Sequence, residues 1–384
     1  MKTFGANFFL ALMTLFICAA LPSGASTIGG RVLAWGKNDY GQINVPADLP
    51  NATAVAGGFS HSLALRENGT VVGWGNNLDG QTNAPSGLND AVAIAAGTAH
   101  SLALRSNGTV IAWGANNFGQ TSIPPGLTGV AAIASGGNHC LALRSNGTVV
   151  AWGHNSLSQT NVPGTLTNVI AIAAGGDHSL ALKQDGTVVF WGYQAFDTPN
   201  VAPSLGNIAA IGCGMEHSLA VGSNGTLVAW GFNSHNQTNV PPGLTDVAAA
   251  IGGLAHSFAL RKNGTLIGWG NNSSSQTNVL SDLTNVLAIA SGSSHNLVLV
   301  DHSTVIPEAP WFESSPGTPQ LTSTGLVLRV KGLVGRGFVT LDGSTNLVNW
   351  DFITFRTSVV GDFQYVDASA TNRPRRFYRV SERR

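Results

Sequence analysis

The chain has 384 residues, equal numbers of acidic and basic side chains, and only 10% charged residues. Residues 26–304 hold 8 basic and 12 acidic residues, and residues 305–384 hold 10 basic and 7 acidic ones. Neither the net charge of −4 nor that of +3 is typical of a protein that binds polyanions. The bulk composition therefore gives no sign of a polyanion-binding protein, and we expect no nucleic-acid partner.

The N-terminus reads as a secretory signal peptide over residues 1–25. One lysine precedes an apolar run from Phe8 to Leu21, and Ser23-Gly24-Ala25 supplies small residues before Ser26. The apolar run is too short for a good membrane span, so we expect no stable span. A retained N-terminal anchor is the alternative. We favour cleavage, and expect a protein that is secreted or held at the cell envelope.

The rest of the chain is dominated by a repeat with a period of 39 residues. Trp-Gly recurs at that spacing with no insertion or deletion, and so does a histidine that precedes an apolar run. The tryptophans are Trp35, Trp74, Trp113, Trp152, Trp191, Trp230 and Trp269, and the histidines are His61, His100, His139, His178, His217, His256 and His295. A fixed period of this length indicates an array of one supersecondary unit.

Each unit reads as an antiparallel meander. The segment His-Ser-Leu-Ala-Leu alternates small and large side chains as a half-buried strand does. Asn-Gly follows, a dipeptide that tolerates positive φ at both central positions of a tight hairpin. Thr-Val-Val-Ala-Trp predicts the return strand, and Val-x-Ala-Ile-Ala-Ala a third strand of small residues. Gln-Thr-Asn-Val-Pro predicts a short outer segment. Three- or four-stranded meanders repeated around an axis make an all-β propeller.

The ends of the repeat predict seven blades with a shared closure. Trp35 has no histidine before it, and His295 has no Trp-Gly after it. Arg31–Trp35 therefore supplies the return strand that the last unit lacks. Such a closure removes the free sheet edge. We expect the propeller to occupy residues 26–305.

The repeated sequence motifs resemble those of the regulator-of-chromosome-condensation repeat family, over roughly Arg31 to Val305. The short unit is most similar to bacterial secreted members, among them the propeller-type β-lactamase inhibitor proteins. That resemblance implies a protein partner, with an exported enzyme as one candidate. Eukaryotic members include a nuclear exchange factor for a small GTPase. An export signal and an acidic propeller argue against that activity here.

Several chemical signals favour structure over catalysis. Seven histidines at one repeated position could form a ring of metal ligands, but a His beside a Gly-x-x turn is more often a structural residue that satisfies loop backbone groups. We expect the tryptophans to pack between blades. Cys140 and Cys213 read as small buried thiols, since positions two blades apart rarely come within disulfide distance. No nucleophile elbow, phosphate loop or paired Cys motif is present. We therefore expect no enzyme, no cofactor and no metal site.

The positions that differ between units are the candidate binding residues. One set lies five residues after each tryptophan, and the other lies in the two residues before each histidine. Because alternate turns of a meander lie at the same end, both sets should converge on one face around the central axis. The candidates are Tyr40, Phe59, Asp79, Phe118, Leu157, Asp177, Phe196, Met215, Glu216, His235 and Leu254.

Two functions compete for that face. The first is a non-enzymatic protein-binding module, which we expect to be a monomer, because aromatic residues are enriched where proteins bind one another. The second is a glycan-binding or polysaccharide-acting propeller, which needs carboxylates and aromatic residues together. Neutral variation in solvated loops is the plain alternative to both. The irregular turn after Trp191 reads equally as a decayed unit or a specialised contact loop.

Beyond the repeat, residues 306–319 are rich in proline and predict a semi-rigid linker. Residues 320–384 contain short apolar segments separated by residues typical of turns, which predict a small β-sandwich. The sequence motifs of this segment look like those of terminal modules of large exported bacterial surface proteins. Its clustered arginines near the C-terminus would suit an anionic surface, or form a solvated basic end.

Overall fold

A computed structural model describes residues 29–49, 51–193, 207–280 and 283–301, and the backbone of seven strands between 311 and 383. The predicted signal peptide, Phe196 with the irregular turn around it, and most of the linker lie outside the described residues. The chain divides into two compact units, Met1–Thr304 and Val305–Arg384, which are considered separately.

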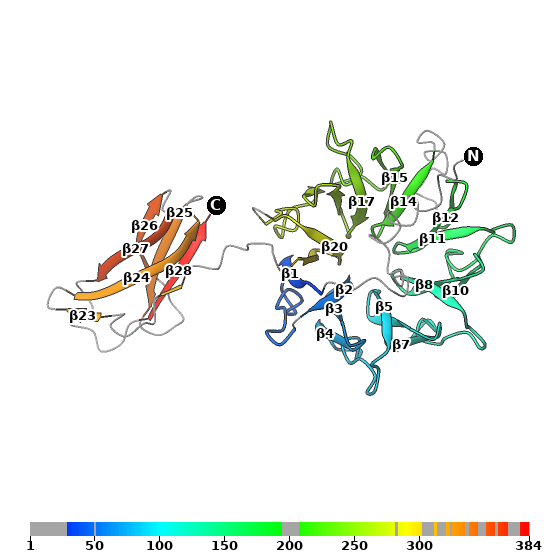
Figure 1. The fold of residues 1–384 in the computed structure, drawn as a ribbon, viewed down its shortest axis with the longest axis horizontal. Helices are drawn as coiled ribbons and strands as arrows, with labels where there is room; N and C mark the ends of the chain where they lie inside the picture. Colours follow the sequence, from blue (N-terminus) through cyan, green and yellow to red (C-terminus); the bar gives the residue numbers. More distant parts are fainter. Residues whose placement is uncertain are drawn as a thin grey trace, which may run out of the picture. The chain divides into compact units, whose positions relative to one another are not determined.

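The first unit is a propeller of seven three-stranded antiparallel sheets arranged around an axis, as Figure 1 shows. This confirms the predicted fold class. The strands nearest the axis are β2 (Ala52–Gly57), β5 (Ala91–Ala96), β8 (Val130–Ser135), β11 (Val169–Ala174), β14 (Ile208–Cys213), β17 (Val247–Gly252) and β20 (Val286–Ser291).

The middle strand of each blade begins at a repeated histidine, and the outermost strand ends at Trp-Gly. The middle strands are β3 (His61–Arg66), β6 (His100–Arg105), β9 (His139–Arg144), β12 (His178–Lys183), β15 (His217–Gly222), β18 (His256–Arg261) and β21 (His295–Val300). The outermost are β4 (Val71–Gly75), β7 (Val110–Gly114), β10 (Val149–Gly153), β13 (Val188–Gly192), β16 (Leu227–Gly231), β19 (Leu266–Gly270) and β1 (Arg31–Gly36).

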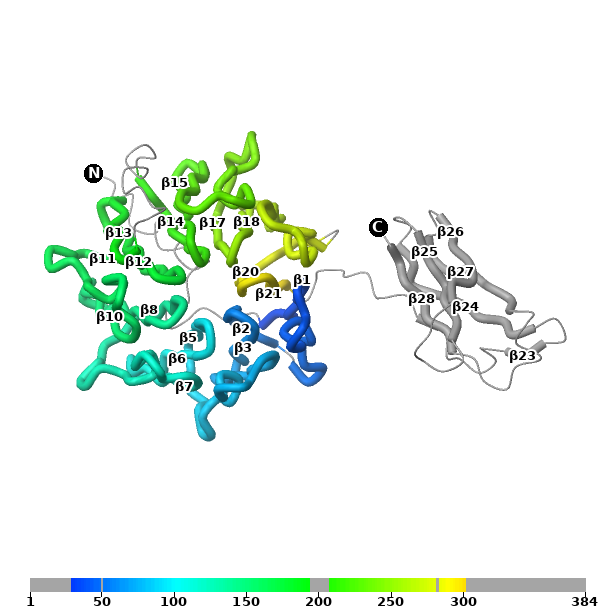
Figure 2. Tube along the Cα trace, turned by 180° about the vertical axis from the view of Figure 1, so that it is seen from behind, coloured from blue at the N-terminus to red at the C-terminus, as the bar shows by residue number. Residues whose placement is uncertain are grey.

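The two ends of the repeat complete one blade. β1 pairs antiparallel with β21 so that Trp35 faces Asn296 and Gly36 faces His295. The same register joins β3 and β4, where Trp74 faces Ser62. The closing blade therefore has the geometry of a blade made from continuous chain, as the unmatched ends predicted. Figure 2 shows β1, β20 and β21 together from behind.

The packing between blades is carried by the repeated tryptophans. Trp74 packs with Leu297 and Leu299 of the preceding, closing blade. Trp113 packs in the same way with Leu63 and Leu65. Each large indole thus fills the space between two sheets, and burial of such a side chain stabilises the fold by about 3 kcal/mol or more. The expected role of the tryptophans is confirmed.

The Asn-Gly hairpins differ from the expected turn. Only the glycine adopts positive φ, +76° at Gly69, whereas Asn68 is not left-handed. The Gly69 amide donates to the Arg66 carbonyl at 3.0 Å, which gives a four-residue turn with the glycine at its end. The Asn68 side-chain oxygen accepts from the Thr70 amide and hydroxyl. Asparagine is repeated for this side-chain contact rather than for its tolerance of positive φ.

The second unit contains two antiparallel sheets, as a small β-sandwich-like domain requires. One joins β22 (Trp311–Phe312), β24 (Gly325–Val334), β23 (Gln320–Thr322) and β27 (Val360–Asp367). The other joins β26 (Asp351–Thr357), β25 (Phe338–Ser344) and β28 (Phe377–Arg383).

Candidate functional site

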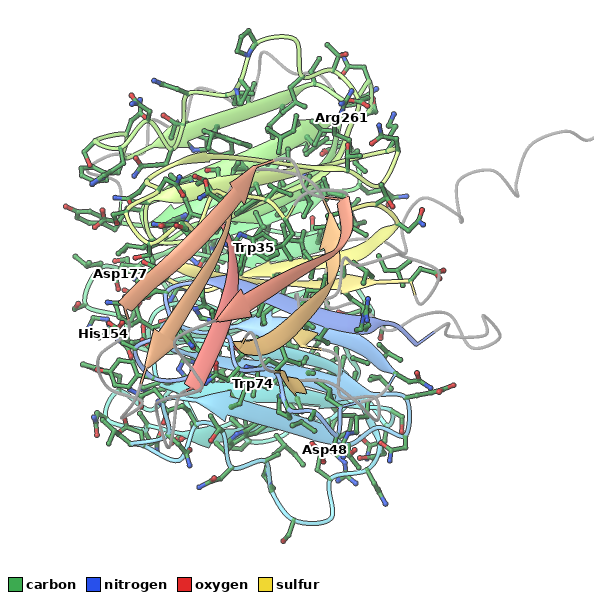
Figure 3. All side chains as sticks on the ribbon, turned by 90° about the vertical axis from the view of Figure 1, so that its left-hand side faces the viewer. Trp35, Asp48, Trp74, His154, Asp177 and Arg261 are labelled. Carbon is green, nitrogen blue, oxygen red and sulfur yellow. The ribbon has the colours of Figure 1, made fainter. Side chains whose placement is uncertain are left out.

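The two variable sets of residues lie at the same end of each blade. His61 pairs with Gly75, and the Asn76 amide donates to the Ser60 carbonyl at 2.9 Å. The turn before the histidine and the turn after Trp-Gly are therefore neighbours. We call this end of the propeller the variable face, and the opposite end, which carries the Asn-Gly turns, the hairpin face. In the edge-on view of Figure 3, Asp177 and His154 mark the variable face, whereas Asp48 and Arg261 mark the hairpin face.

The turns before the histidines form a rim around the propeller axis that is closed by hydrogen bonds. The Phe59 amide donates to the Gly97 carbonyl at 3.1 Å, and the Leu254 amide donates to the Ser293 carbonyl at 2.9 Å. Equivalent bonds join the other neighbouring turns of the rim, and the Ser293 hydroxyl donates back to the Phe59 carbonyl at 2.7 Å. Because these bonds use main-chain carbonyls, the side chains of Phe59 and Leu254 are not needed to hold the rim.

The turns after Trp-Gly are held by a buried glutamine. The Gln42 side-chain oxygen accepts from the Tyr40 amide at 2.9 Å, and Gln120 accepts from the Phe118 amide at 2.8 Å. The same bond is made to Asp79, Leu157, His235 and Ser274. The variable residue is thus fixed through its backbone, and its side chain is available to the surface.

Large apolar side chains gather on this face. Tyr40 is 53% exposed and Phe118 is 49% exposed. Among the described residues, the large hydrophobic side chains that are exposed are Tyr40, Phe59, Leu78, Phe118, Leu157, Tyr193 and Leu254. All seven belong to a turn before a histidine or to a turn after Trp-Gly. Five of them are candidates from the sequence. Leu78 and Tyr193 were missed because we compared only the fifth position of the second turn between units.

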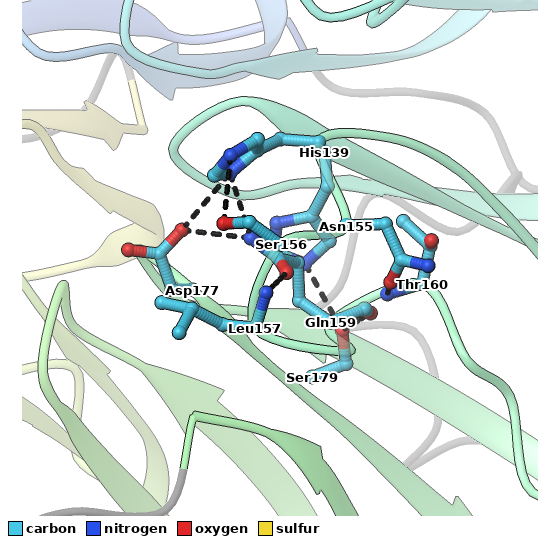
Figure 4. Close-up of polar contacts among 9 residues, drawn as sticks. His139, Asn155, Ser156, Leu157, Gln159, Thr160, Asp177 and Ser179 are labelled. Atoms are coloured by element: carbon cyan, nitrogen blue, oxygen red, sulfur yellow. Dashed lines mark hydrogen bonds and ion pairs between the residues drawn. The ribbon is translucent and has the colours of Figure 1, made fainter.

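The structure also builds a polar cluster that the sequence analysis did not find. The His154 and Phe118 rings lie 4.5 Å apart, and His154 Nδ1 lies 3.6 Å from Asp177 Oδ1. Gln159 bridges them, since its Nε2 donates to Asp177 Oδ1 at 2.8 Å and lies 2.9 Å from His154 Nδ1. Figure 4 shows Leu157, Gln159 and Asp177 gathered at this point. His154 is the second residue after Trp152, another position that varies between units and could have drawn attention to the cluster.

The cluster has the residue types of a Ser-His-Asp triad but not its proton arrangement. His154 Nε2 lies 2.9 Å from the exposed Ser156 hydroxyl. The donation from Gln159 places a lone pair on His154 Nδ1, so in the neutral ring the proton sits on Nε2. That nitrogen then donates to Ser156 and does not accept its proton, as a general base must. We therefore assign no hydrolytic chemistry to this cluster.

Beneath the variable face, the repeated histidines form a buried ring that joins each blade to the next. Each Nε2 lies 2.8–3.2 Å from a side chain at the second position of the neighbouring middle strand. The pairs are His61 with Ser101, His100 with Cys140, His139 with Ser179, His178 with Ser218, His217 with Ser257, His256 with Asn296 and His295 with Ser62. Besides a contact with loop backbone of the expected kind, which His139 makes with Gly176, these histidines thus make side-chain contacts between blades.

The hydrogen-bond partners of the buried imidazoles indicate which ring nitrogen carries the proton. Asn296 Nδ2 donates to the Gln276 carbonyl, so its oxygen must accept the proton of His256 Nε2. In four other blades the serine hydroxyl donates to the equivalent carbonyl, as Ser62 does to Gln42 at 2.8 Å, and in a fifth the Cys140 thiol donates to the Gln120 carbonyl at 3.4 Å. The Trp74 indole donates to that same carbonyl at 2.9 Å. One carbonyl therefore receives two hydrogen bonds at the junction between two blades.

Burial keeps the histidine ring neutral. Desolvation lowers the pKa of His61, His139, His178 and His217 to about 3, and that of His100, His256 and His295 to about 4. Repulsion from neighbouring histidines adds to the shift at several positions, as His295 and His100 do at His61. The glycine three residues before each histidine is also fixed by packing, since a Cβ at Gly58 would overlap the His61 ring.

The described residues hold no group of three or more His, Cys, Asp or Glu side chains placed to bind a metal. Cys140 and Cys213 are buried thiols, as expected, and burial raises the pKa of Cys140. Asp79 and Glu216 are exposed, and of the three candidate carboxylates Asp177 alone has side-chain partners in the polar cluster. His235 is exposed and Met215 half-buried on the same face. In the described part of the chain, no helix has the length and apolar character needed to cross a bilayer.

Comparison with known proteins identifies the repeat. A search of curated protein sequences found no match. Among solved structures, Prp20p from Saccharomyces cerevisiae is 20% identical with a TM-score of 0.62, covering 76% of this chain and 94% of that one. Human WBSCR16 is 21% identical with a TM-score of 0.59, covering 70% and 99%. The receptor kinase CR4 ectodomain from Physcomitrella patens is 23% identical with a TM-score of 0.54, covering 67% and 72%.

These likenesses show the fold, and a sequence-family model shows the family. The model for the regulator of chromosome condensation (RCC1) repeat matches six units, at residues 52–81, 91–120, 130–159, 169–196, 208–237 and 245–276. The seventh unit is the closing blade, which is assembled from the two ends of the repeat. The chain belongs to the family of proteins built from regulator of chromosome condensation repeats.

Proposed function

We propose that this chain is an exported, non-enzymatic binding module whose variable face holds a protein partner. The observation that carries the proposal is that all seven exposed large apolar side chains among the described residues lie on one face. The backbones of five of them are fixed by the rim or by the buried glutamines. A rigid surface with projecting aromatic residues binds at low entropic cost, because little ordering is needed.

The fold is used for protein binding elsewhere. Prp20p has been studied for its binding to Gsp1p and histones, and a structure shows it bound by Kap60. At 20% identity these partners do not transfer to this chain. They support the general use of a propeller of this kind as a binding surface.

The test replaces three residues of the variable face, Tyr40, Phe118 and Leu157, by alanine. We expect loss of a specific partner from pull-downs of the native secretome, with an unchanged melting temperature. Truncating a central aromatic contact typically weakens binding by about 2 kcal/mol or more, or roughly 30-fold. A matched control replaces Asn107, Lys183 and Arg261 on the hairpin face. Equal retention of the partner by both triple variants would contradict the proposal, and so would a collapse of stability in the first.

Glycan binding is the second candidate, and the polar cluster is the observation that favours it. The His154 ring contacts the Phe118 ring and lies 3.6 Å from the Asp177 carboxylate, so aromatic rings and a carboxylate belong to one cluster. Sugar recognition commonly needs that combination. If an Asp177→Asn, Glu216→Gln variant lost binding to, or turnover of, a polysaccharide while keeping every protein partner, this function would replace the first.

Export is tested at the N-terminus. We expect the protein isolated from its source cells to begin near Ser26, because Phe8–Leu21 and Ala25 have the pattern of a cleaved signal. N-terminal sequencing of secreted material reads the site directly. Recovery of the full-length chain from the cytosol would overturn export, and would favour an intracellular regulatory propeller.

A further inference from the structure

Charged residues are divided unequally between the two faces. Of the eight Lys and Arg residues in 26–304, only Lys37 lies on the variable face. The others lie at strand ends or turns of the hairpin face, and they are Arg31, Arg66, Arg105, Arg144, Lys183, Arg261 and Lys262. Lys37 is itself paired with Asp39 at 2.9 Å. The variable face therefore has no cation in the described residues that is left for other carboxylates.

The carboxylates of the two faces differ in the same way. On the hairpin face, Asp90 binds Arg105 at 2.9 Å and Asp246 binds Arg261 at 2.7 Å. Asp48 and Asp185 also face a cation. On the variable face, Asp79, Asp177 and Glu216 have no Lys or Arg partner among the described residues. Four carboxylates of the hairpin face are therefore paired with a cation of the chain, whereas Asp79, Asp177 and Glu216 of the variable face are not paired with a Lys or Arg among the described residues.

Apolar and acidic side chains of the variable face form one continuous patch across four blades. We define the acidic patch as Phe118, His154, Leu157, Asp177, Met215 and Glu216. Phe118 contacts His154, which contacts Asp177, and Leu157 shares the Gln159 side chain with Asp177. The residue before Asp177, Gly176, donates its amide to the Met215 carbonyl at 2.7 Å.

Two turns of the rim in this same sector carry glycine. Gly137 and Gly176 occupy positions where other blades carry Phe59, Met215 or Leu254, and a Cβ on either would clash with a carbonyl of the next turn at 2.7 Å. The Met215 methyl group lies 3.3 Å from where a Cβ of Gly176 would be. Gly137 and Gly176 are thus buried against the next turn, and beside Gly176 the rim presents the side chains of Asp177, Met215 and Glu216.

We propose that the acidic patch binds a cationic segment of a protein partner, in which Lys or Arg side chains alternate with apolar ones. The inference rests on the proposed protein-binding function and specifies the chemistry of the partner. Guanidinium and ammonium groups would supply the cations that Asp177 and Glu216 lack, and could also lie against the Phe118 ring. Apolar neighbours of the partner would cover Leu157 and Met215.

The test uses the full chain and a phage-displayed library of random 12-residue peptides as the probe. Peptides selected on the wild-type protein are synthesised, and their affinities are measured by fluorescence anisotropy at about 50 and 500 mM NaCl. We expect selected peptides to carry net positive charge together with aromatic or aliphatic residues. Their affinity should fall at least about tenfold at the higher salt, since screening shortens the reach of charge attraction.

Two double variants separate the patch from the overall charge of the protein. Asp177→Asn with Glu216→Gln removes two carboxylates from the acidic patch, and should weaken the peptides about tenfold or more. Asp90→Asn with Asp246→Asn makes the same change in net charge on the hairpin face, and should leave their affinity within about twofold. Equal effects of the two pairs would overturn the inference.

The outcomes also separate this inference from the proposed function. Neutral or acidic peptides that lose binding in Phe118→Ala would overturn the cationic partner and keep the protein-binding face. Peptides unaffected by Phe118→Ala would count against the face itself. A concentration-dependent dimer seen by light scattering, lost on Asp177→Asn with Glu216→Gln, would show that a second copy of this chain occupies the patch, which would also overturn the inference.

Discussion

The hairpin face and the variable face are two ends of the same seven sheets, yet they differ in what their side chains contact. On the hairpin face the repeated residues contact one another: Asn107 accepts from Thr109, and Arg105 binds Asp90. On the variable face the constant contacts are made by backbone amides and buried glutamines, while the exposed side chains change from blade to blade. Repetition marks residues whose partners lie within the propeller, in the same blade or in the next one. Variation marks residues that folding does not need.

Both faces belong to one propeller, which we expect to unfold cooperatively. The largest expected effect is its unfolding in acid. The lowered pKa of each buried histidine means that the unfolded state binds protons first as pH falls below about 6.5. Above that pH the neutral histidines carry no such penalty. As the pH falls from about 6.5 toward the folded-state pKa values of about 3 to 4, the folded state loses stability relative to the unfolded state. At pH 5 each histidine costs about 2 kcal/mol, and seven cost about 14.

That loss is as large as the whole stability of a typical domain. We therefore expect cooperative unfolding of the propeller near pH 5, followed by circular dichroism and tryptophan fluorescence. The control replaces His235, an exposed histidine outside the ring, by glutamine, and should leave the midpoint unchanged because the ring stays intact. A fully native signal at pH 4 would show that the ring does not stay neutral in the way its burial requires.

The closing blade is built from two segments that come from opposite ends of the repeat. The next test therefore concerns its tryptophan. Trp35 packs edge-on against Phe258 at 5.7 Å and donates to the Gln276 carbonyl. Trp35→Ala should cost about 3–5 kcal/mol, as for other large core side chains. Trp74→Ala in a continuous blade should cost a similar amount. Chemical denaturation measures both, and a much smaller loss for Trp35→Ala would mean that the ring opens easily at this blade.

A third test compares one exposed residue from each face. Asn107→Ala removes the acceptor for the Thr109 amide and hydroxyl, and should destabilise the propeller by about 1 kcal/mol. Phe118→Ala on the variable face should change the free energy of unfolding by less than about 0.5 kcal/mol, because Gln120 holds the backbone and not the ring. The two values come from urea titrations of the single variants. Reversal of their order would place Phe118 in the core and remove it from the binding surface.

The sequence was sufficient for the propeller because an unbroken period shows both the unit and its unmatched ends. Trp35 and His295 alone predicted the closing pair. The hairpin was misjudged, because Asn-Gly fits two kinds of turn and the choice depends on the Thr70 contact. The contacts between blades were also missed. His61 and Ser101 are 40 residues apart, one unit plus one residue, and nothing in either strand alone shows that they meet.

The candidate site was predicted in outline and not in its contacts. The alternation of turns in an antiparallel meander was enough to place Tyr40 and Phe59 at the same end of the sheets. It could not show that Phe118, His154 and Asp177, from three different units, touch one another. Such contacts depend on the angle between neighbouring blades, which is set by packing and not by the repeat.

The smallest expected effect concerns the charges of the two faces. Arg105 and Asp90 are both partly exposed, so a double-mutant cycle with alanine should give a coupling of about 0.5 kcal/mol, and this should fall toward zero in 1 M salt. Asp177→Asn and Glu216→Gln should instead leave the free energy of unfolding within about 0.5 kcal/mol of wild type, because neither carboxylate meets a Lys or Arg in the described residues. Urea titrations at low and high salt measure both sets. A loss above about 1 kcal/mol for Asp177→Asn, removed by salt, would mean that His154 already neutralises Asp177 as a cation. The two faces would then be alike in being satisfied within the chain, and the difference between them would reduce to apolar exposure.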